Sequence, residues 1–339
     1  MSDIAVIGGG AWGTGIAIVL GRKGTHRVRL WAHETDVCES IAQTRVNDKF
    51  LPGRRIPDPV TASNDLAATL HGAQIVVSVM PSQHCRALFE RMRPLLQPQV
   101  LIVSATKGLE EVSLLRMTEV IDHVLRRDDG TAPAVGALSG PSFAQEVARG
   151  DPTAITIASQ NAELLRTVQQ EFSDPAFRVY TNNDVVGVEL GGALKNIIAI
   201  AAGICDGLGL GHNSVAALIT RGLAEMTRLV VACGGRPETM AGLAGLGDLV
   251  LTCTGGLSRN RSVGVELGRG QKLPEIIAAM HGMVAEGVFT TSAAVGLAHA
   301  RSVEMPITEQ MHAILHLGKS PREAIQELMS RTGKSEVSF

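Results

Sequence analysis

One lysine stands out because it lies inside a long apolar, glycine-rich stretch of the chain. Within residues 185–205 the formal charges are Glu189 and Lys195, in the run VELGGALKNIIAIAAG. A lysine is costly to bury unless it has a partner or a task, and a buried amine changes its protonation readily. The pattern therefore predicts that Lys195 transfers a proton. The alternative is a lysine that extends its amine to the surface.

A second candidate for chemistry is GLGDLVLTCTGGLSRNR, residues 245–261. Asp248 lies there among apolar residues and glycines, and Ser258 precedes Arg259 where a helix is expected to begin. Serine is a favoured N-cap, a helix N-terminus attracts anions, and arginine offers phosphate a planar fork. The stretch predicts an anion site, although a plain capped surface helix would have the same sequence.

Glycines interrupt the first apolar segment of the chain, IAVIGGGAWG. Gly8, Gly10 and Gly13 match G-x-G-x-x-G between a strand-like run and a helical one. In this context the first glycine permits a tight turn, the second lets a pyrophosphate approach the backbone, and the third lets helix and strand pack closely. The motif predicts dinucleotide binding; the alternative is merely a tight strand–helix turn.

The end of the next expected strand, residues 26–31, bears on the choice of cofactor. His33 and Glu34 follow it, where a carboxylate at the strand tip would normally read the ribose of NAD. A histidine could instead bind the 2′-phosphate of NADP, best when protonated. We therefore expect use of both NADPH and NADH, with a modest preference for NADPH. A solvated His33, or an inward-facing Glu34, is the alternative.

Polar residues also follow two later strand-like segments. Lys107 lies in SATKGL, and Gly140 and Ser142 lie in SGPSFAQE. Open parallel sheets bind ligands beyond the carboxyl ends of their strands, so we expect these residues at a ligand. Ser142 and Gln145 have the spacing of a capping box for the following helix. The alternatives are a surface lysine and a serine that only caps.

These residues need two kinds of domain to position them. Strands alternate with helices up to about residue 180, which predicts an α/β fold: a Rossmann-type, doubly wound parallel sheet covered on both faces. The later segments carry helical periodicity. We therefore expect a dinucleotide-binding domain at residues 1–184 and an all-helical substrate and catalytic domain at residues 185–339.

Composition excludes several other classes of protein. The 31 basic and 33 acidic residues give a formal charge of -2, which argues against nucleic acid as a partner. Five scattered cysteines without a C-x-x-C pair indicate a reduced, cytoplasmic chain. We see no signal peptide and no apolar run long enough for membrane insertion. Glu309, His312 and His316 have metal-like spacing, but we expect a solvated helix face and no metal.

Taken together, the motifs resemble bacterial-type NAD(P)-dependent glycerol-3-phosphate dehydrogenases nearly from end to end. The resemblance rests on the segments IGGGAWGT, SATKGL, SGPSFAQE, GVELGGALKNIIAIAAGICDGLGLG, LITRGLAEM, GLGDLVLTCT, SRNR, VAEG and EMPIT. It implies a helical domain like that of the 6-phosphogluconate dehydrogenase superfamily. It also implies reversible, NADP(H)- or NAD(H)-dependent reduction of dihydroxyacetone phosphate to sn-glycerol 3-phosphate for phospholipid synthesis, and it leaves a homodimer open.

The same resemblance assigns roles by position. It makes Lys195 the catalytic proton acceptor in alcohol oxidation, with Asp248 beside it. It implies cofactor contacts at Gly8, Gly10, Ala11, Trp12, Gly13, His33, Lys107, Ala144, Arg259, Val284 and Glu286. It implies substrate contacts at Lys107, Gly140, Ser142, Lys195, Asp248, Ser258, Arg259 and Asn260. Two residues depart from the family: Gly15 replaces the usual alanine, and His33 is often arginine in relatives.

Two other readings stay open at this point. One is a 3-hydroxyacid or 6-phosphogluconate type dehydrogenase, but those enzymes place an asparagine four residues after the lysine, where this chain has Ala199. The other is a non-catalytic NADPH-binding protein. Such a protein would have little reason to keep Lys107, Lys195, Asp248 and Arg259 together.

Overall fold

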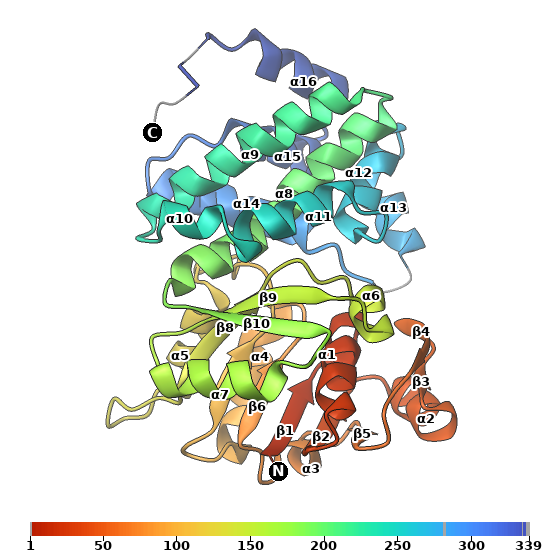
Figure 1. Cartoon of the computed structure of the whole chain (residues 1–339). Coiled ribbons are helices and arrows are strands. Elements are labelled where there is room, and N and C mark those ends of the chain that lie inside the picture. The colour runs from red at the N-terminus through yellow and green to blue at the C-terminus, as the bar shows by residue number, and fades with distance from the viewer. Residues whose placement is uncertain (1, 281–282, 334, 337–339) are drawn as a thin grey trace. The chain divides into compact units, whose positions relative to one another are not determined.

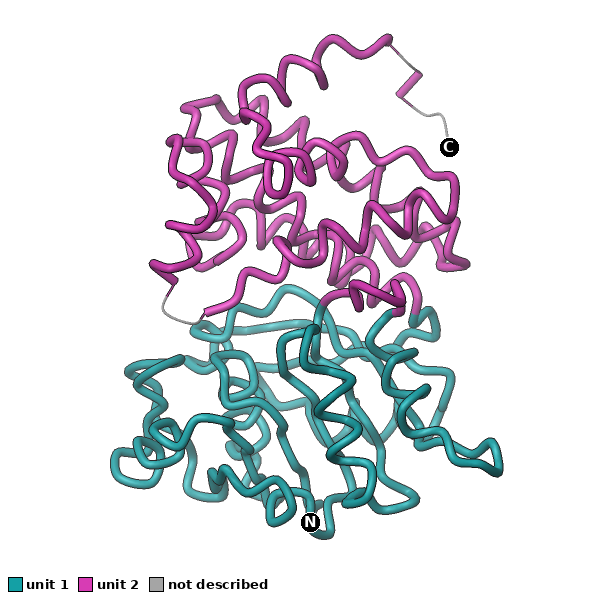
Figure 2. The backbone as a smooth tube through the Cα atoms, turned by 180° about the vertical axis from the view of Figure 1, so that it is seen from behind, with its two compact units in different colours: residues 1–107, 116–185 teal, residues 108–115, 186–339 magenta. Residues whose placement is uncertain are grey.

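The computed structural model describes residues 2–280, 283–333 and 335–336 of the 339-residue chain (Figure 1). The chain forms two compact units, which are coloured separately in Figure 2. Residues 1–107 and 116–185 make up the first unit, and residues 108–115 and 186–339 make up the second. The cofactor and substrate roles that we expect for the two parts of the chain remain predictions.

The first unit is built on an eight-stranded sheet of order β10-β9-β8-β7-β6-β1-β2-β5. In chain order these strands are β1 (Ser2–Ile7), β2 (His26–Trp31), β5 (Val60–Ser63), β6 (Ile75–Ser78), β7 (Leu101–Ser104), β8 (Val135–Ser139), β9 (Thr153–Ala158) and β10 (Phe177–Asn182). Strand β1 pairs in parallel with both β2 and β6. The strand order reverses at β1, and open α/β sheets bind ligands beside such a reversal.

Helices cover this sheet because its central strands are apolar on both faces. Ile4 and Val6 of β1 alternate with Ala5 and Ile7, and all four are fully buried. Ile4 and Val6 share one apolar cluster with residues of helix α1 (Ala11–Arg22). The remaining helices are α2 (Thr35–Thr44), α3 (Leu66–Leu70), α4 (Cys85–Met92), α5 (Met117–Leu125), α6 (Ala144–Arg149) and α7 (Ala162–Phe172), with short 3-10 turns η1 (Ser82–His84) and η2 (Arg93–Leu95).

The observed elements refine the sequence prediction at their ends. Strand β2 occupies the predicted residues 26–31, and helix α1 begins at Ala11, directly after the second glycine of the motif. Strand β7 ends at Ser104, three residues before Lys107. The small hairpin of β3 (Val46–Asn47) and β4 (Leu51–Arg55) was not expected from the sequence, nor were strands β5 and β10.

The sheet is not parallel throughout, which corrects our expectation. Strands β8 and β9 pair antiparallel, with Leu138 opposite Ile157. The short helix α6 between them packs against α1: a Cβ added to Gly15 of α1 would lie 3.6 Å from the carbonyl oxygen of Ala144. The chain thus does not cross back over the sheet before β9 begins, and β9 returns in the opposite direction.

The described part of the second unit is helical. Its elements are α8 (Val185–Gly207), α9 (His212–Ala232), α10 (Pro237–Met240), the π-helical turn η3 (Leu243–Gly247), α11 (Asp248–Thr254), α12 (Arg259–Gly268), α13 (Leu273–Ala279), α14 (Glu286–Ala300), α15 (Pro306–Leu317) and α16 (Pro321–Ser330) (Figure 1). Helix α8 supplies much of the apolar core, as its glycine-rich, apolar sequence predicted.

Two segments of this unit meet the length and composition of a membrane span. One is the helix Val185–Gly207, and the other is the bent pair Pro237–Thr254 plus Arg259–Gly268. In the helix, 83% of the most apolar window is buried inside the protein. We therefore interpret it as a core helix of this unit rather than a membrane span.

A buried carboxylate joins two helices of the second unit. Glu225 of α9 accepts hydrogen bonds from the backbone N–H groups of Ile307 and Thr308, at 2.9 and 2.8 Å. These groups open α15, so Glu225 caps that helix from a different element. Burial raises the pKa of Glu225, while the two N–H groups act in the opposite direction. Both oxygens of Glu225 thus stabilise the packing of α15 against α9.

Candidate active site

The glycine loop after β1 has room for a phosphate on one side only. Gly8 has φ +131°, and a Cβ there would lie 2.5 Å from the carbonyl oxygen of Val79. A Cβ at Gly13 would lie 1.9 Å from the carbonyl oxygen of Gly8, whereas one at Gly10 would meet nothing within 4 Å. The loop is therefore tightly packed at Gly8 and Gly13 and open at Gly10. This is the cradle that a pyrophosphate needs.

The first turn of α1 offers amide donors at the same place. The helix begins at Ala11, and its N-cap Gly10 provides no side-chain acceptor for the first amides. Ala11 and Trp12 are partly exposed. Uncapped N–H groups and the helix dipole both favour a bound anion. The residues present thus fit a dinucleotide cofactor.

His33 and Glu34 occupy different environments beyond the end of β2. The N–H of Gly8 donates to the carbonyl of Trp31 at 3.0 Å, so this strand end adjoins the glycine loop. His33 is exposed, and its ring centroid lies 6.0 Å from that of Trp31. Glu34 is half-buried at the N-cap position of α2. Which of the two reads the ribose stays a prediction.

The polar residues that follow β7 and β8 come together, as expected. The Lys107 amine donates to the carbonyl of Gly140 at 3.4 Å, and the Ser142 hydroxyl donates to the same oxygen at 3.0 Å. Gly140 has φ +138°, a conformation that strongly favours glycine. These three predicted substrate contacts thus form one cluster at the carboxyl end of the sheet.

The predicted capping box at Ser142 is wrong. Helix α6 begins two residues later, at Ala144, with Phe143 as its N-cap and no side-chain cap. The Ser142 hydroxyl is instead used by the turn at Gly140. The side chain of Gln145 accepts a hydrogen bond from Arg54 Nε at 3.0 Å. A matching spacing was insufficient here because a local turn competed for the hydroxyl.

Lys195 and Asp248 form a buried ion pair in the second unit. The amine nitrogen lies 2.5 Å from Asp248 Oδ1. Lys195 is 6% exposed and Asp248 1%, so the alternative of a lysine reaching the surface is excluded. A Cβ added to Gly191 would lie 2.6 Å from the carbonyl oxygen of Ala244. Gly191 lies four residues before Lys195, and Ala244 lies four residues before Asp248. The close approach of these two backbone segments therefore brings the lysine and the aspartate together.

Thr252 is a third member of this site that the sequence analysis missed. Its hydroxyl accepts from the Lys195 amine at 2.7 Å and donates to the carbonyl of Asp248 at 2.6 Å. The signal was its position four residues after Asp248, one helical turn along the same face. The hydroxyl and the carboxylate together orient the Lys195 amine, and the carboxylate also balances its positive charge.

Cys253, which follows Thr252 in the sequence, has an unreactive thiol. Burial raises the pKa of the Cys253 thiol to about 12, although the charge of Lys195 acts in the opposite direction. A neutral thiol is a poor nucleophile and a poor metal ligand. The arrangement around Lys195 is therefore suited to moving a proton, with a carboxylate to hold the charged amine.

The predicted cap at the start of α12 is confirmed. The Ser258 side chain accepts from the backbone N–H of Arg261 at 3.2 Å. Arg259 lies in the first turn, where desolvation by the surrounding protein lowers the pKa of its guanidinium and the charge of Glu286 acts in the opposite direction. Helix N-terminus and guanidinium thus lie where an anion could bind both, but binding itself stays a prediction.

Asn260 is placed by hydrogen bonds to two other helices. Its amide donates to Asn196 Oδ1 at 3.0 Å, and its oxygen accepts from the N–H of Gly287 at 2.9 Å. Asn196 follows the lysine on α8, and Gly287 follows Glu286 at the start of α14. Val284, half-buried, lies just before that helix. Through these hydrogen bonds Asn260 connects the start of α14, next to Glu286, with the part of α8 that carries Lys195.

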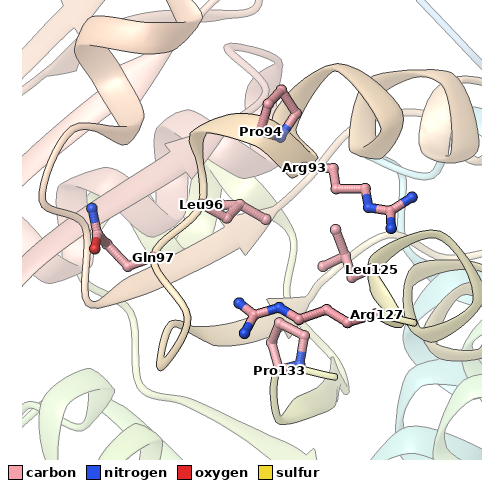
Figure 3. A pocket seen from close by; sticks show the side chains of 7 residues that line it. All are labelled: Arg93, Pro94, Leu96, Gln97, Leu125, Arg127 and Pro133. Atoms are coloured by element: carbon pink, nitrogen blue, oxygen red, sulfur yellow. The ribbon is translucent and has the colours of Figure 1, made fainter. Parts of the chain in front are cut away.

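The first unit also has a hollow of about 310 Å³, which none of the candidate site residues lines (Figure 3). Its lining comes from segments that precede β7 and β8, so it is at the opposite ends of these strands from Lys107 and Gly140. The lining residues are Arg93, Pro94, Leu96, Gln97, Leu125, Arg127 and Pro133. We do not assign it to the cofactor or the substrate.

The histidines with metal-like spacing do not form a metal site among the described residues. No group of three or more His, Cys, Asp or Glu there could hold an ion. The His312 and His316 rings lie 5.0 Å apart, and His316 Nε2 lies 3.2 Å from the carbonyl oxygen of Val288.

Comparisons with known proteins cover both units. Residues 3–165 match the family model of the NAD-dependent glycerol-3-phosphate dehydrogenase N-terminus, and residues 184–326 match that of its C-terminus. The NAD(P)⁺-dependent glycerol-3-phosphate dehydrogenase of Koribacter versatilis is 68% identical over 337 residues, 99% of each chain. That of Geobacter sulfurreducens is 53% identical over 333 residues, 98% of each chain.

Solved structures give the same match. The crystal structure of glycerol-3-phosphate dehydrogenase from Coxiella burnetii superposes with a TM-score of 0.92 at 44% identity, covering 97% of this chain and 99% of that one. The yeast glycerol-3-phosphate dehydrogenase gives a TM-score of 0.80 at 27% identity, with 97% and 99% coverage.

Proposed function

The chain belongs to the family of NAD(P)-dependent glycerol-3-phosphate dehydrogenases, and on this premise we propose that Lys195 and Asp248 are its catalytic pair. The enzyme interconverts dihydroxyacetone phosphate and glycerol 3-phosphate with NADP(H) or NAD(H). The observation that supports the assignment of residues is the buried contact of Lys195 with Asp248 and Thr252. A charged amine in a fixed position can stabilise the negative charge that develops on the carbonyl oxygen of the substrate and can give it a proton.

The proton chemistry follows from this arrangement. When bound, the nicotinamide supplies a hydride to the ketone carbon, or accepts one in the reverse direction. Lys195 stabilises the negative charge that develops on the oxygen and gives it a proton; in the reverse direction it accepts the proton. Asp248 and Thr252 keep the amine oriented. Arg259 and the helix start at Ser258 hold the substrate phosphate, and so set the position of the ketone.

The remaining predicted contacts divide between cofactor and substrate. We assign the glycine loop, Ala11, Trp12, His33 and Ala144 to the cofactor. We assign Gly140, Ser142 and Asn260 to the substrate. Lys107 and Arg259 serve both ligands, and Val284 and Glu286 complete the cofactor set. These assignments rest on the family resemblance together with the clusters described above.

An assay of the purified chain tests the activity directly. Mixing it with NADPH or NADH and dihydroxyacetone phosphate should consume the reduced cofactor. Glycerol 3-phosphate with the oxidised cofactor should give the reverse reaction. Turnover of 3-hydroxyacids or 6-phosphogluconate in place of these substrates, or cofactor binding with no turnover at all, would contradict the proposal.

We predict that Arg259→Ala raises the KM for dihydroxyacetone phosphate and lowers kcat/KM at least about tenfold, because charge-assisted contacts to phosphate are strong. Arg259→Lys should recover only part of the loss, since a point charge cannot replace a planar fork. The matched control is Arg269→Ala, at the other end of α12, where the arginine pairs with Glu266 at 2.7 Å. Unchanged steady-state constants in Arg259→Ala would remove it from the site.

We predict a modest preference for NADPH over NADH, because the imidazole of His33 can donate a hydrogen bond to the 2′-phosphate. His33→Ala should weaken NADPH binding and barely change NADH binding. Titration of both cofactors into wild type and variant measures this. A wild-type preference for NADH, or equal losses of both cofactors in the variant, would show that Glu34 or another residue contacts the ribose.

We also propose the setting in which the enzyme works. The five cysteines are free, which fits a reducing compartment such as the cytoplasm. The family resemblance suggests that reduction of dihydroxyacetone phosphate supplies phospholipid precursor. It leaves a homodimer as the state to test, and sedimentation of the purified chain would distinguish dimer from monomer.

A further inference from the structure

We propose that Asn47 is a positioning residue that presets the glycine loop for the cofactor pyrophosphate. Asn47 belongs to β3, outside the glycine motif, and is 0% exposed. Its amide nitrogen donates to the carbonyl of Gly9 at 2.7 Å and to the hydroxyl of Thr14 at 2.8 Å. This inference rests on the proposed function, because it takes the glycine loop as the pyrophosphate site.

The hydrogen bonds of Asn47 leave its side chain no capacity for a ligand. Both amide hydrogens are used by Gly9 and Thr14, and its oxygen accepts from the N–H of Phe50 at 3.2 Å. Asn47 therefore acts through the loop rather than by touching the cofactor. The Thr14 hydroxyl also lies 3.3 Å from the Gly9 carbonyl oxygen, so this oxygen receives two hydrogen bonds.

Fixing the Gly9 carbonyl also fixes the amide of Gly10, the residue at which the loop leaves room for a phosphate. The carbonyl of Gly9 and the N–H of Gly10 belong to one planar peptide group, so they turn together. From its other side the loop is pressed onto the end of β2, since a Cβ at Gly9 would lie 2.4 Å from that of Ala32. Without Asn47 this glycine-rich peptide could rotate, because glycine restricts the backbone least.

The hairpin that carries Asn47 is itself anchored. Arg45, in the left-handed conformation that ends α2, directs its guanidinium at the carbonyls of Ile56, Pro57 and Val60. These bonds close the base of the hairpin. Near the same base, where Arg55 pairs with Val46, Arg54 donates to Gln145 of α6. Two arginines thus fasten the base of the hairpin that holds the loop, as a positioning device requires.

The test compares Asn47→Asp with wild type. Aspartate keeps the shape and the acceptor for Phe50, but it places an oxygen where Gly9 and Thr14 need a donor. We expect the Kd of NADPH and of NADH to rise about tenfold or more, which is the change in affinity that corresponds to the loss of about one hydrogen bond. At saturating cofactor, kcat and the KM for dihydroxyacetone phosphate should stay within about twofold. Asn64→Ala, which removes an exposed amide that donates to Thr35, is the matched control.

Two competitive inhibitors separate positioning from general damage. ADP-ribose contains the pyrophosphate and should inhibit Asn47→Asp more weakly than wild type. Adenosine lacks the phosphates and should inhibit both proteins equally. If Asn47→Asp does not fold, Thr14→Val, which removes one of the two acceptors, should show the same pattern at smaller size.

The outcomes distinguish the inference from the proposed function. Equal cofactor affinity in the folded Asn47→Asp and wild type would overturn the inference. Equal weakening of adenosine and ADP-ribose, or a fall in kcat at saturating cofactor, would overturn it as well. If wild type itself binds neither NADPH nor NADH, the proposed function fails instead.

Discussion

We expect Lys195→Met to lower kcat by a factor of about 10²–10⁴, the range over which a positioned acid or base contributes. Methionine fills similar space without a proton or a charge, so the substrate oxygen would lose both its proton donor and its stabilising cation. Because Lys195 is not among the residues that we assign to the cofactor, the Kd of NADPH should change little. Steady-state kinetics and a cofactor titration of the same preparation measure the two effects.

A second lysine provides the control for this experiment. Lys319 pairs with Glu327, also at 2.5 Å, but that pair lies at the surface between α15 and α16. Lys319→Met should leave kcat unchanged, since exposed ion pairs contribute little. If Lys195→Met kept more than about a third of wild-type turnover, a loss far below that range, Lys195 would not be the proton-transfer residue.

Much of the first unit could be predicted because its signals are local. A glycine motif between an apolar run and a helical run is readable over ten residues, and β2 lies where it was predicted. The antiparallel pairing of β8 with β9 was missed because it depends on where α6 packs. That packing involves α1, more than a hundred residues earlier, and no local pattern encodes it.

The candidate site divides in the same way. Lys195 could be singled out because a charge in an apolar helix is conspicuous by itself. Thr252 and Asn47 were missed because threonine and asparagine are ordinary polar residues until their partners are known. The partners of Asn47 lie 33 and 38 residues away. The capping box at Ser142 failed for the converse reason, since a nearby carbonyl took the hydroxyl that the spacing had assigned to a helix.

The carboxylate of the buried pair should matter for stability as well as for catalysis. Asp248→Asn keeps the shape of the side chain but leaves the Lys195 amine buried without its counter-charge. Breaking a buried ion pair by removing one partner costs about 3–5 kcal/mol, so the free energy of unfolding should fall by that order. Denaturant unfolding of variant and wild type at neutral pH measures the loss.

The kinetic consequence has a direction in pH. Without the carboxylate, burial favours the neutral amine, so less of the enzyme carries the proton that reduction of the ketone needs. We expect kcat for reduction at neutral pH to fall by at least about tenfold, and to recover partly as pH is lowered. Lys195→Met should show no such recovery, because it has no amine to protonate. This difference separates loss of the proton donor from loss of its counter-charge.

Two comparisons decide how far the result belongs to Asp248 itself. Glu327→Gln removes the carboxylate of the surface pair with Lys319 and should leave the free energy of unfolding and kcat nearly unchanged. Thr252→Val removes the neutral partner of Lys195 and keeps the charge, so its pH profile should stay that of wild type while kcat falls less. If Asp248→Asn were as stable and as active as wild type at every pH, the amine would not depend on this carboxylate, and the proposed catalytic pair would be wrong.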